Sequence, residues 1–151
     1  MMFRLHIAEE FIVAARNGDI HFVEQFIKKY KDNPNNVLNA RTQNGSTAFM
    51  WAADRGHANI VKLLGATPGV NVNIANLEGD TPLLTAAFNG HDAVVRELLA
   101  IPSIDPNATN NYGDTAIMWA FESEHDSIVQ ILLAVPGINP TLTNAMYPRI
   151  S

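Results

Sequence analysis

Three histidines, His57, His91 and His125, are the residues whose type and spacing first suggest chemistry in this chain. Imidazole is a frequent zinc ligand, but every ligand of one zinc must lie about 2 Å from the metal. The histidines recur at a constant interval of 34 residues, and a period of that length places equivalent side chains on successive stacked helices, roughly 8–10 Å apart. We therefore expect no metal site, and histidines that tie the loop between two helices by hydrogen bonds.

Acidic side chains are the second set of candidates, as general acids and bases. They include Glu9, Glu10, Asp80, Asp114, Glu122 and Glu124. A catalytic carboxylate needs a desolvated pocket that moves its pKa towards the working pH, whereas we expect these residues on helix surfaces or at hairpin tips. The chain also lacks cysteine, the glycine-rich phosphate loops and a nucleophile elbow. We predict that it is not an enzyme and that it needs no cofactor.

Charge and composition restrict the partner classes. The net charge is −5 and no basic stripe is present, which argues against nucleic acid because phosphate binding depends on Lys and Arg. No segment reaches the 18 or so apolar residues of a membrane span, and Glu9 and Glu10 interrupt what would be a signal peptide. The absence of cysteine suits a reducing compartment. We expect a cytoplasmic protein that does not bind membranes.

The elements that must position these residues follow from an internal repeat. Residues 39–72, 73–106 and 107–140 form three units of 34 residues, in which glycine, threonine and histidine recur in register. The recurring positions are Gly45, Gly79 and Gly113; Thr47, Thr81 and Thr115; and the three histidines. Such a period is typical of solenoids, whose units bury their apolar faces only against one another.

The middle unit has the clearest signals for two helices. Thr81 followed by Pro82 predicts a helix start, because the hydroxyl can cap an amide and proline fits the first helical position. Gly90 ends this helix after about Asn89. A second helix begins at His91-Asp92 and is followed by a proline turn and an extended loop. Each unit therefore contributes two antiparallel helices and one loop.

This pattern resembles the ankyrin repeat family, on the residues Gly79-Asp80-Thr81-Pro82-Leu83, Ala86-Ala87 and Gly90-His91. The resemblance implies an all-α fold, an α-solenoid of stacked helix-turn-helix units with β-hairpin loops. We expect one domain over residues 1–151, with an N-terminal capping repeat at 3–38, full repeats at 39–72, 73–106 and 107–140, and a partial repeat at 141–151. The last full repeat departs from the pattern, since Glu124 stands where glycine would adopt a left-handed conformation after a helix.

Two stripes run along the first helix of each unit. The first has i, i+3, i+4 spacing, and we expect it to be buried; it comprises Phe49, Ala52 and Ala53; Leu83, Ala86 and Ala87; and Ile117, Ala120 and Phe121. The second lies about 200° further round the helix and comprises Trp51, Asp54 and Arg55; Thr85, Phe88 and Asn89; and Trp119, Glu122 and Ser123. In the ankyrin family the corresponding positions line a concave groove where partners commonly dock.

The resemblance, together with the aromatic and charged composition of the second stripe, predicts a non-catalytic module that binds another protein. We expect a monomer whose binding residues are Trp51, Asp54, Arg55, Leu77, Glu78, Thr85, Phe88, Asn89, Tyr112, Trp119 and Glu122, with Gln43, Asn44 and Asn111 also at the hairpin tips. Two alternatives remain open. The chain could be a structural spacer or a fragment of a longer ankyrin-repeat protein, and the tryptophans could simply fill gaps between units.

Overall fold

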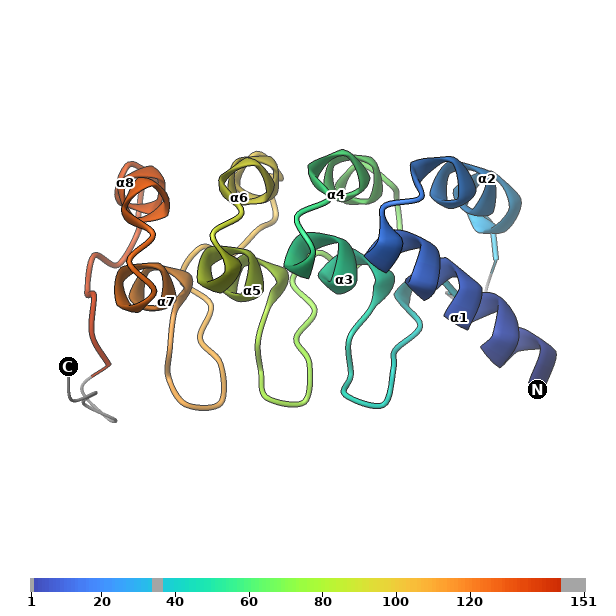
Figure 1. Ribbon diagram of the computed structural model, residues 1–151, viewed down its shortest axis with the longest axis horizontal. Coiled ribbons are helices and arrows are strands. Elements are labelled where there is room, and N and C mark those ends of the chain that lie inside the picture. The colour runs from blue at the N-terminus through green and yellow to red at the C-terminus, as the bar shows by residue number, and fades with distance from the viewer. Residues whose placement is uncertain (1, 34–36, 145–151) are drawn as a thin grey trace.

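The computed structural model describes residues 2–33 and 37–144, and within them the chain folds into eight α-helices and one short 3-10 helix. The helices are α1 Met2–Asn17, α2 Ile20–Tyr30, α3 Ala48–Asp54, α4 Ala58–Gly65, α5 Pro82–Asn89, α6 Asp92–Leu99, α7 Ala116–Glu122 and α8 Asp126–Leu133, with the 3-10 helix η1 at Val37–Asn39. Consecutive helices pair into four units that stack in one row (Figure 1). The expected all-α solenoid is confirmed.

The four units form two layers of helices (Figure 1). The first helices of the units, α1, α3, α5 and α7, make an inner layer, and the second helices, α2, α4, α6 and α8, make an outer layer. Loops project from the inner layer on the side away from the outer helices. No helix in the described part of the chain is long and apolar enough to cross a membrane.

Local sequence explains where the inner helices begin and end. Thr81 caps α5 by accepting a hydrogen bond from the Leu84 amide at 3.3 Å, and the threonines of the neighbouring units do the same. Gly90 ends α5 with φ 76°. Because the same cap recurs in each unit, α3, α5 and α7 start in register and present equivalent positions to the same side.

The core is one continuous layer between the inner and outer helices. Alanines at the paired positions of α3 and α5 are fully buried, and their small size allows adjacent inner helices to pack closely. Larger side chains from the outer helices, such as Leu64, Leu98 and Leu132, fill the remaining space. Burying these apolar side chains contributes about 1.5–3 kcal/mol each.

Phe121 was expected in the buried stripe, and that prediction is wrong, because its side chain is 47% exposed. The equivalent residues Ala53 and Ala87 are buried and each has a following inner helix in the stack. No helix follows α8 among the described residues, so the described part of the chain offers nothing comparable to cover the larger ring of Phe121.

The loops between units are hairpin-shaped (Figure 1). Backbone hydrogen bonds close them, from Thr42 to Ser46 at 2.8 Å, from Asn76 to Asp80 at 3.0 Å and from Asn110 to Asp114 at 3.0 Å. These bonds are too few to form a β-strand anywhere in residues 2–33 and 37–144. The expected partial repeat is described only as far as Asn144, and residues 145–151 and 34–36 lie outside the described residues.

Candidate functional site

The second stripe of the inner helices lies beside the hairpin loops and combines partly exposed side chains from every unit. Trp51, Thr85 and Trp119 are half-buried at the same register of α3, α5 and α7. Val13 holds the corresponding place in α1 and is 40% exposed. The stripe is therefore a surface that runs across the repeats, and its two tryptophans are neither fully buried nor fully exposed.

Two arginine side chains lie against the indole ring of Trp51. The guanidinium of Arg55 lies 5.4 Å from the centroid of the indole ring, and that of Arg16, from the neighbouring unit, lies 5.6 Å away. Both distances fall within the range of cation–π attraction. Arg55 also pairs with Asp54, with Nε and Oδ2 3.4 Å apart. The contacts place positive charge around Trp51.

Phe88 and Trp119 form a second aromatic cluster further along the stripe. Their ring centroids lie 5.4 Å apart, with the planes inclined by 64° in an edge-to-face arrangement. Phe88 is 54% exposed although it is apolar. Because the two rings come from adjacent units, their contact fixes an apolar ledge that spans α5 and α7.

Hydrogen bonds between units hold this surface in shape. The Asn89 amide donates to the backbone oxygen of Asp54 at 3.2 Å and to its Oδ1 at 3.0 Å. At the hairpin tips the Asn111 amide donates to the Leu77 carbonyl at 2.9 Å. Leu77 is nonetheless 69% exposed. The tips and the stripe are therefore ordered before any partner arrives.

A small cavity of about 100 Å³ joins the stripe to the hairpin loops. It is lined by Asn44, Ser46, Met50, Trp51, Asp54, Asn76 and Thr85, which come from both walls. We call the hollow between the inner helices and the hairpin loops the groove. The Nε1 atoms of Trp51 and Trp119 are buried in the protein with no hydrogen-bond acceptor among the described residues, an arrangement that normally costs about 1–3 kcal/mol.

The predicted binding residues fall into two rows. Trp51, Asp54, Arg55, Thr85, Phe88, Asn89, Trp119 and Glu122 belong to the inner helices or the residue that follows them, whereas Leu77, Glu78 and Tyr112 belong to the hairpin tips. Of these residues, Trp51, Asp54 and Thr85 line the 100 Å³ cavity together with Asn44 and Asn76 of the hairpin loops. Their role in binding stays a prediction.

The histidines form a ladder of structural hydrogen bonds. The Nε2 atoms of His57, His91 and His125 lie 2.8, 2.8 and 3.0 Å from the backbone oxygens of Arg16, Asp54 and Phe88 respectively. Each bond satisfies a carbonyl near the end of the preceding inner helix, where helical partners are missing. The expected structural role is confirmed, and the bonds join successive units. No group of three or more His, Asp or Glu able to hold a metal occurs in the described ranges.

Asp80 and Asp114 were expected at exposed positions, and this is wrong, because both are buried, at 6% and 3% exposure. Asp80 accepts a hydrogen bond from the Asn110 amide, and Asp114 accepts one from Asn144, each at 3.0 Å. The Asn110 Oδ1 in turn accepts from the Asp114 amide at 3.0 Å. These carboxylates therefore brace neighbouring hairpin loops.

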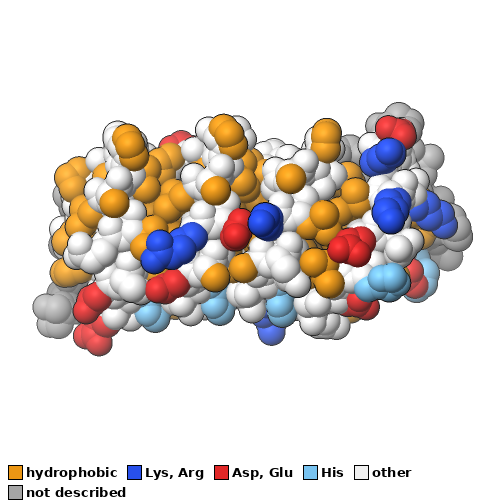
Figure 2. Space-filling view, turned by 90° about the horizontal axis from the view of Figure 1, so that it is seen from above, with side chains coloured by type: hydrophobic (Ala, Val, Ile, Leu, Met, Phe, Trp, Pro, Cys, Tyr) orange, Lys and Arg blue, Asp and Glu red, His pale blue; other side chains and the backbone are white. Residues whose placement is uncertain are grey.

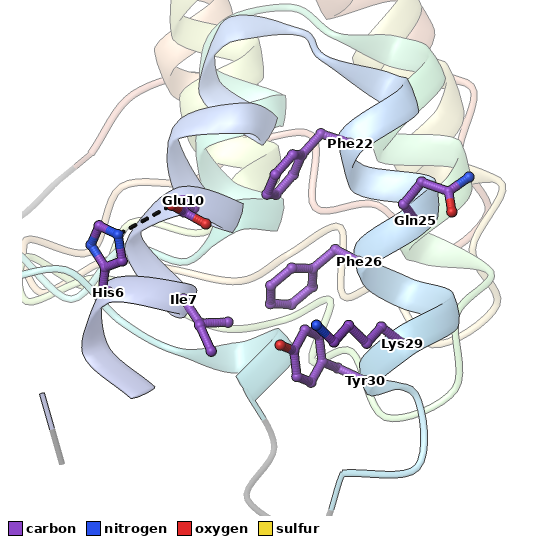
Figure 3. Close-up of a pocket in the computed structure, with 8 residues that line it drawn as sticks. All are labelled: His6, Ile7, Glu10, Phe22, Gln25, Phe26, Lys29 and Tyr30. Carbon is purple, nitrogen blue, oxygen red and sulfur yellow. Dashed lines mark ion pairs between the residues drawn. The ribbon is translucent and has the colours of Figure 1, made fainter. Parts of the chain in front are cut away.

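A cavity near the N-terminus lies between α1 and α2 and has a volume of about 440 Å³ (Figure 3). Phe22 and Phe26 of α2 point into it towards Ile7 of α1, and a pair between His6 and Glu10, 3.2 Å apart, lies at its rim. This is the end of the stack, where no preceding unit among the described residues covers the helices. The cavity is thus the uncovered side of the first unit.

Sequence reasoning missed Arg16, Val13 and the asparagine ladders. Arg16 could have been found by extending the alignment of the N-terminal unit, because it stands in register with Asp54. A ladder of Asn39, Asn73 and Asn107 also recurs every 34 residues. The Asn73 amide donates to the Ser103 carbonyl at 2.6 Å, and its Oδ1 accepts from the Asp105 amide at 3.0 Å. The 34-residue spacing of these asparagines was the feature of the sequence that could have predicted the ladder.

The outer layer has a different character. Basic side chains gather over α2, whose last turn carries Lys28 and Lys29, while hydrophobic side chains show in the furrows between the outer helices (Figure 2). The aromatic pair of Phe88 and Trp119, by contrast, belongs to the inner helices α5 and α7. Fold and surface together define a repeat protein of helix pairs with projecting hairpin loops.

The family-model comparison agrees with this class. A model of ankyrin repeats in three copies matches residues 11–110 and 66–144. The chain belongs to the ankyrin repeat family, whose repeats are generally protein–protein interaction modules and whose domains are typically non-catalytic. No curated protein sequence matches it.

Proposed function

We propose that this chain is a non-catalytic module that binds another protein in the groove. The observation that carries the proposal is the aromatic ledge of Phe88 and Trp119, held 5.4 Å apart while Phe88 is 54% exposed. Aromatic side chains fixed in place lose little entropy on binding and often dominate interface energies. Exposure of these apolar rings to water gives the protein no advantage unless a partner covers them.

The hairpin tips supply a second row of contacts. Leu77 is 69% exposed and Tyr112 is 50% exposed. Backbone hydrogen bonds keep both tips in register. The backbone N–H of Leu77 donates to the Asn44 carbonyl, and the backbone N–H of Asn111 donates to the Glu78 carbonyl, each at 3.0 Å. A partner that fills the groove would touch the tips and the ledge at once.

The test is affinity capture on the immobilised full chain, read by mass spectrometry. We expect proteins retained by wild type to be lost with a Trp51→Ala, Trp119→Ala double variant, because truncating a central aromatic commonly costs about 2 kcal/mol or more. Leu133→Ala is the matched control, since Leu133 is 40% exposed on the outer helix α8. Circular dichroism must show that each variant is folded.

Unchanged capture by the double variant would contradict a role for the stripe. If Leu77→Ser and Tyr112→Ser then abolished capture, recognition would rest on the hairpin tips alone. Loss of capture in the Leu133→Ala control would mean that the outer layer binds, and the groove assignment would be wrong.

The C-terminal end of the stack bears on the spacer alternative. A Cβ atom at Gly18, Gly56 or Gly90 would lie 2.7–2.8 Å from the histidine ring of the following unit. At the equivalent position Glu124 already carries a Cβ, with φ 61°. A further unit with a histidine in register would meet that atom. Glu124 therefore disfavours a following unit that carries a histidine in this register.

The N-terminal end shows the complementary change. Asp19 stands where the later units have histidine, and its carboxylate caps α2 by accepting from the Phe22 amide at 3.0 Å. It does not reach back towards a preceding unit as His57 does. Asp19 thus replaces the histidine contact that joins the later units by a cap within its own unit.

We further propose that the module is monomeric and cytoplasmic. The cysteine-free composition suits a reducing compartment. Light scattering across a tenfold range of concentration and fractionation of the expressing cell test the two proposals, and a concentration-dependent mass or a membrane-bound pool would refute them.

A further inference from the structure

We infer that the groove recognises an elongated protein segment of one charge order, with carboxylates at the end that lies on Arg16 and Arg55, apolar side chains in the middle and basic side chains at the end that lies on α7. This inference rests on the proposed function, and adds the chemistry of the partner and its direction in the groove.

The first end of the groove is built to hold guanidinium groups in place. Arg16 and Arg55 lie 5.6 and 5.4 Å from the ring centroid of Trp51. A guanidinium stacked on an aromatic face keeps its N–H edge available, and two parallel N–H groups match a carboxylate. None of the hydrogen bonds found among the described residues uses the Arg16 side chain, and Arg55 engages Asp54 through Nε only.

Local charge at this end is positive. Asp54 is the nearby acid, and it is shared between Arg55 at 3.4 Å and the Asn89 amide at 3.0 Å. Arg41 adds a further positive charge on the first hairpin, where its Nη1 donates to the Ala75 carbonyl at 3.0 Å. Arg16 and Arg55 against Asp54 leave a net positive charge beside Trp51, which favours a carboxylate.

The other end of the groove is negative. From residue 97 to residue 144 the sequence contains no Lys or Arg. Its acids at the end of the inner helix α7 are Glu122 and Glu124, whereas Glu97 and Asp126 belong to the outer helices α6 and α8. Glu122 belongs to the predicted stripe and is exposed at the end of α7, with Glu124 also exposed two residues later. Lys and Arg side chains on a partner would be favoured here.

The charges at the two ends of the groove act on a partner independently of each other. The inner helices α3 and α7 are two units apart, or roughly 16–20 Å at ordinary helix spacing. Charges on exposed surfaces are screened beyond about 8 Å at physiological salt. Between α3 and α7 lies Phe88 of α5, which packs edge-to-face against Trp119 in α7, one turn before Glu122. The order along the groove is basic, apolar and acidic, and a segment of the opposite direction would place like charges together at both ends.

Selection of peptides from a random 16-residue library displayed on phage, panned on the immobilised full chain, tests the inference. We expect enriched peptides with Asp or Glu at one end, large apolar residues in the middle and Lys or Arg at the other end. Synthetic copies should bind an Arg16→Gln, Arg55→Gln variant about tenfold more weakly, since each exposed ion pair contributes up to about fivefold. The matched control is Lys62→Gln, Arg96→Gln, which removes the same charge from α4 and α6 of the outer layer and should change affinity less than twofold.

Each outcome decides one point. Peptides that need Phe88 and Trp119 but show no charge order, or that bind the arginine variant as well as wild type, would overturn the inference and leave the proposed function standing. Peptides insensitive to Phe88→Ser and Trp119→Ala, or no enrichment at all, would overturn both. Reversing the charge order of an enriched peptide at constant composition should weaken binding, and equal affinity of the reversed peptide would also refute the inference.

Discussion

Replacing Gly90 by alanine probes the contact that sets the spacing between two units. The glycine has φ 76°, and a Cβ atom there would lie 2.7 Å from Cε1 of His125. A left-handed conformation costs an L-residue about 1–2 kcal/mol. The ring of His125 must also move and lose its hydrogen bond to the Phe88 carbonyl, now 3.0 Å long, which contributes about 0.5–1.5 kcal/mol. We expect Gly90→Ala to lower the free energy of unfolding by about 2–3 kcal/mol.

A double-mutant cycle separates the two terms. His125→Ala alone should cost about 1 kcal/mol for the lost hydrogen bond. In that background the methyl group of Gly90→Ala meets no ring, so only the left-handed term of about 1–2 kcal/mol remains. The double variant should therefore be about 1 kcal/mol more stable than the sum of the single effects. Glu124→Ala is the matched control: the position is equivalent, φ is 61° without glycine, and we expect a change below about 0.5 kcal/mol.

Urea unfolding, followed by tryptophan fluorescence and far-UV circular dichroism, measures the free energies of unfolding of wild type, the two single variants, the double variant and the Glu124→Ala control. Coincident transitions by both probes are required for a two-state treatment. Single effects that add within about 0.3 kcal/mol would show that the methyl and the ring do not meet. A Glu124→Ala variant as unstable as Gly90→Ala would likewise refute the argument, because no following unit among the described residues places a histidine ring against position 124.

Three further predictions follow from the ladders. Glu124→Gly should raise the free energy of unfolding by about 1 kcal/mol, and with it the urea midpoint, because glycine removes the left-handed penalty. An unchanged or lower midpoint would contradict this. Asn110→Ala should cost about 2–3 kcal/mol in the same assay, since it leaves the buried Asp80 without its amide donor and removes two bonds to backbone amides; a cost below 1 kcal/mol would mean that the asparagine ladder is not structural. Thermal melts with excess zinc or with a chelator should superimpose, and an upward shift with low zinc would show that the repeat histidines converge on a metal.

The features that sequence predicted are those decided within one unit. Thr81 and Gly90 fix the ends of α5 at the expected residues, because capping and left-handed backbone depend on a few neighbouring atoms. The left-handed Glu124 was likewise expected, and its φ of 61° confirms it. Each of these inferences needed only the repeat register and the stereochemistry of a helix end.

Features decided between units were harder to predict. The i, i+3, i+4 pattern placed Phe121 in the core, but burial at that position requires a following unit, and periodicity alone does not say whether one is present. Asp80 looked like a hairpin residue in solvent, whereas an asparagine 30 residues later covers it. Arg16 was missed because its contact with Trp51 joins the least regular unit to its neighbour. The binding role of the groove residues stays a prediction.

The ladders have a consequence for binding as well as for stability. Successive units are tied by a histidine bond to the end of an inner helix, an asparagine bond at the outer turn, and amide bonds at the hairpin tips. The separation of Trp51 from Trp119 is therefore set by two rigid unit-to-unit steps, whereas flexible loops would leave it variable. A partner meets aromatic side chains whose positions are already fixed, so less of the interaction energy offsets ordering. His91 lies outside the groove, but His91→Ala removes a hydrogen bond that fixes α5 relative to α3. We therefore expect this substitution to lower the affinity for a partner that spans both tryptophans. The affinity for a partner that contacts a single unit should fall less.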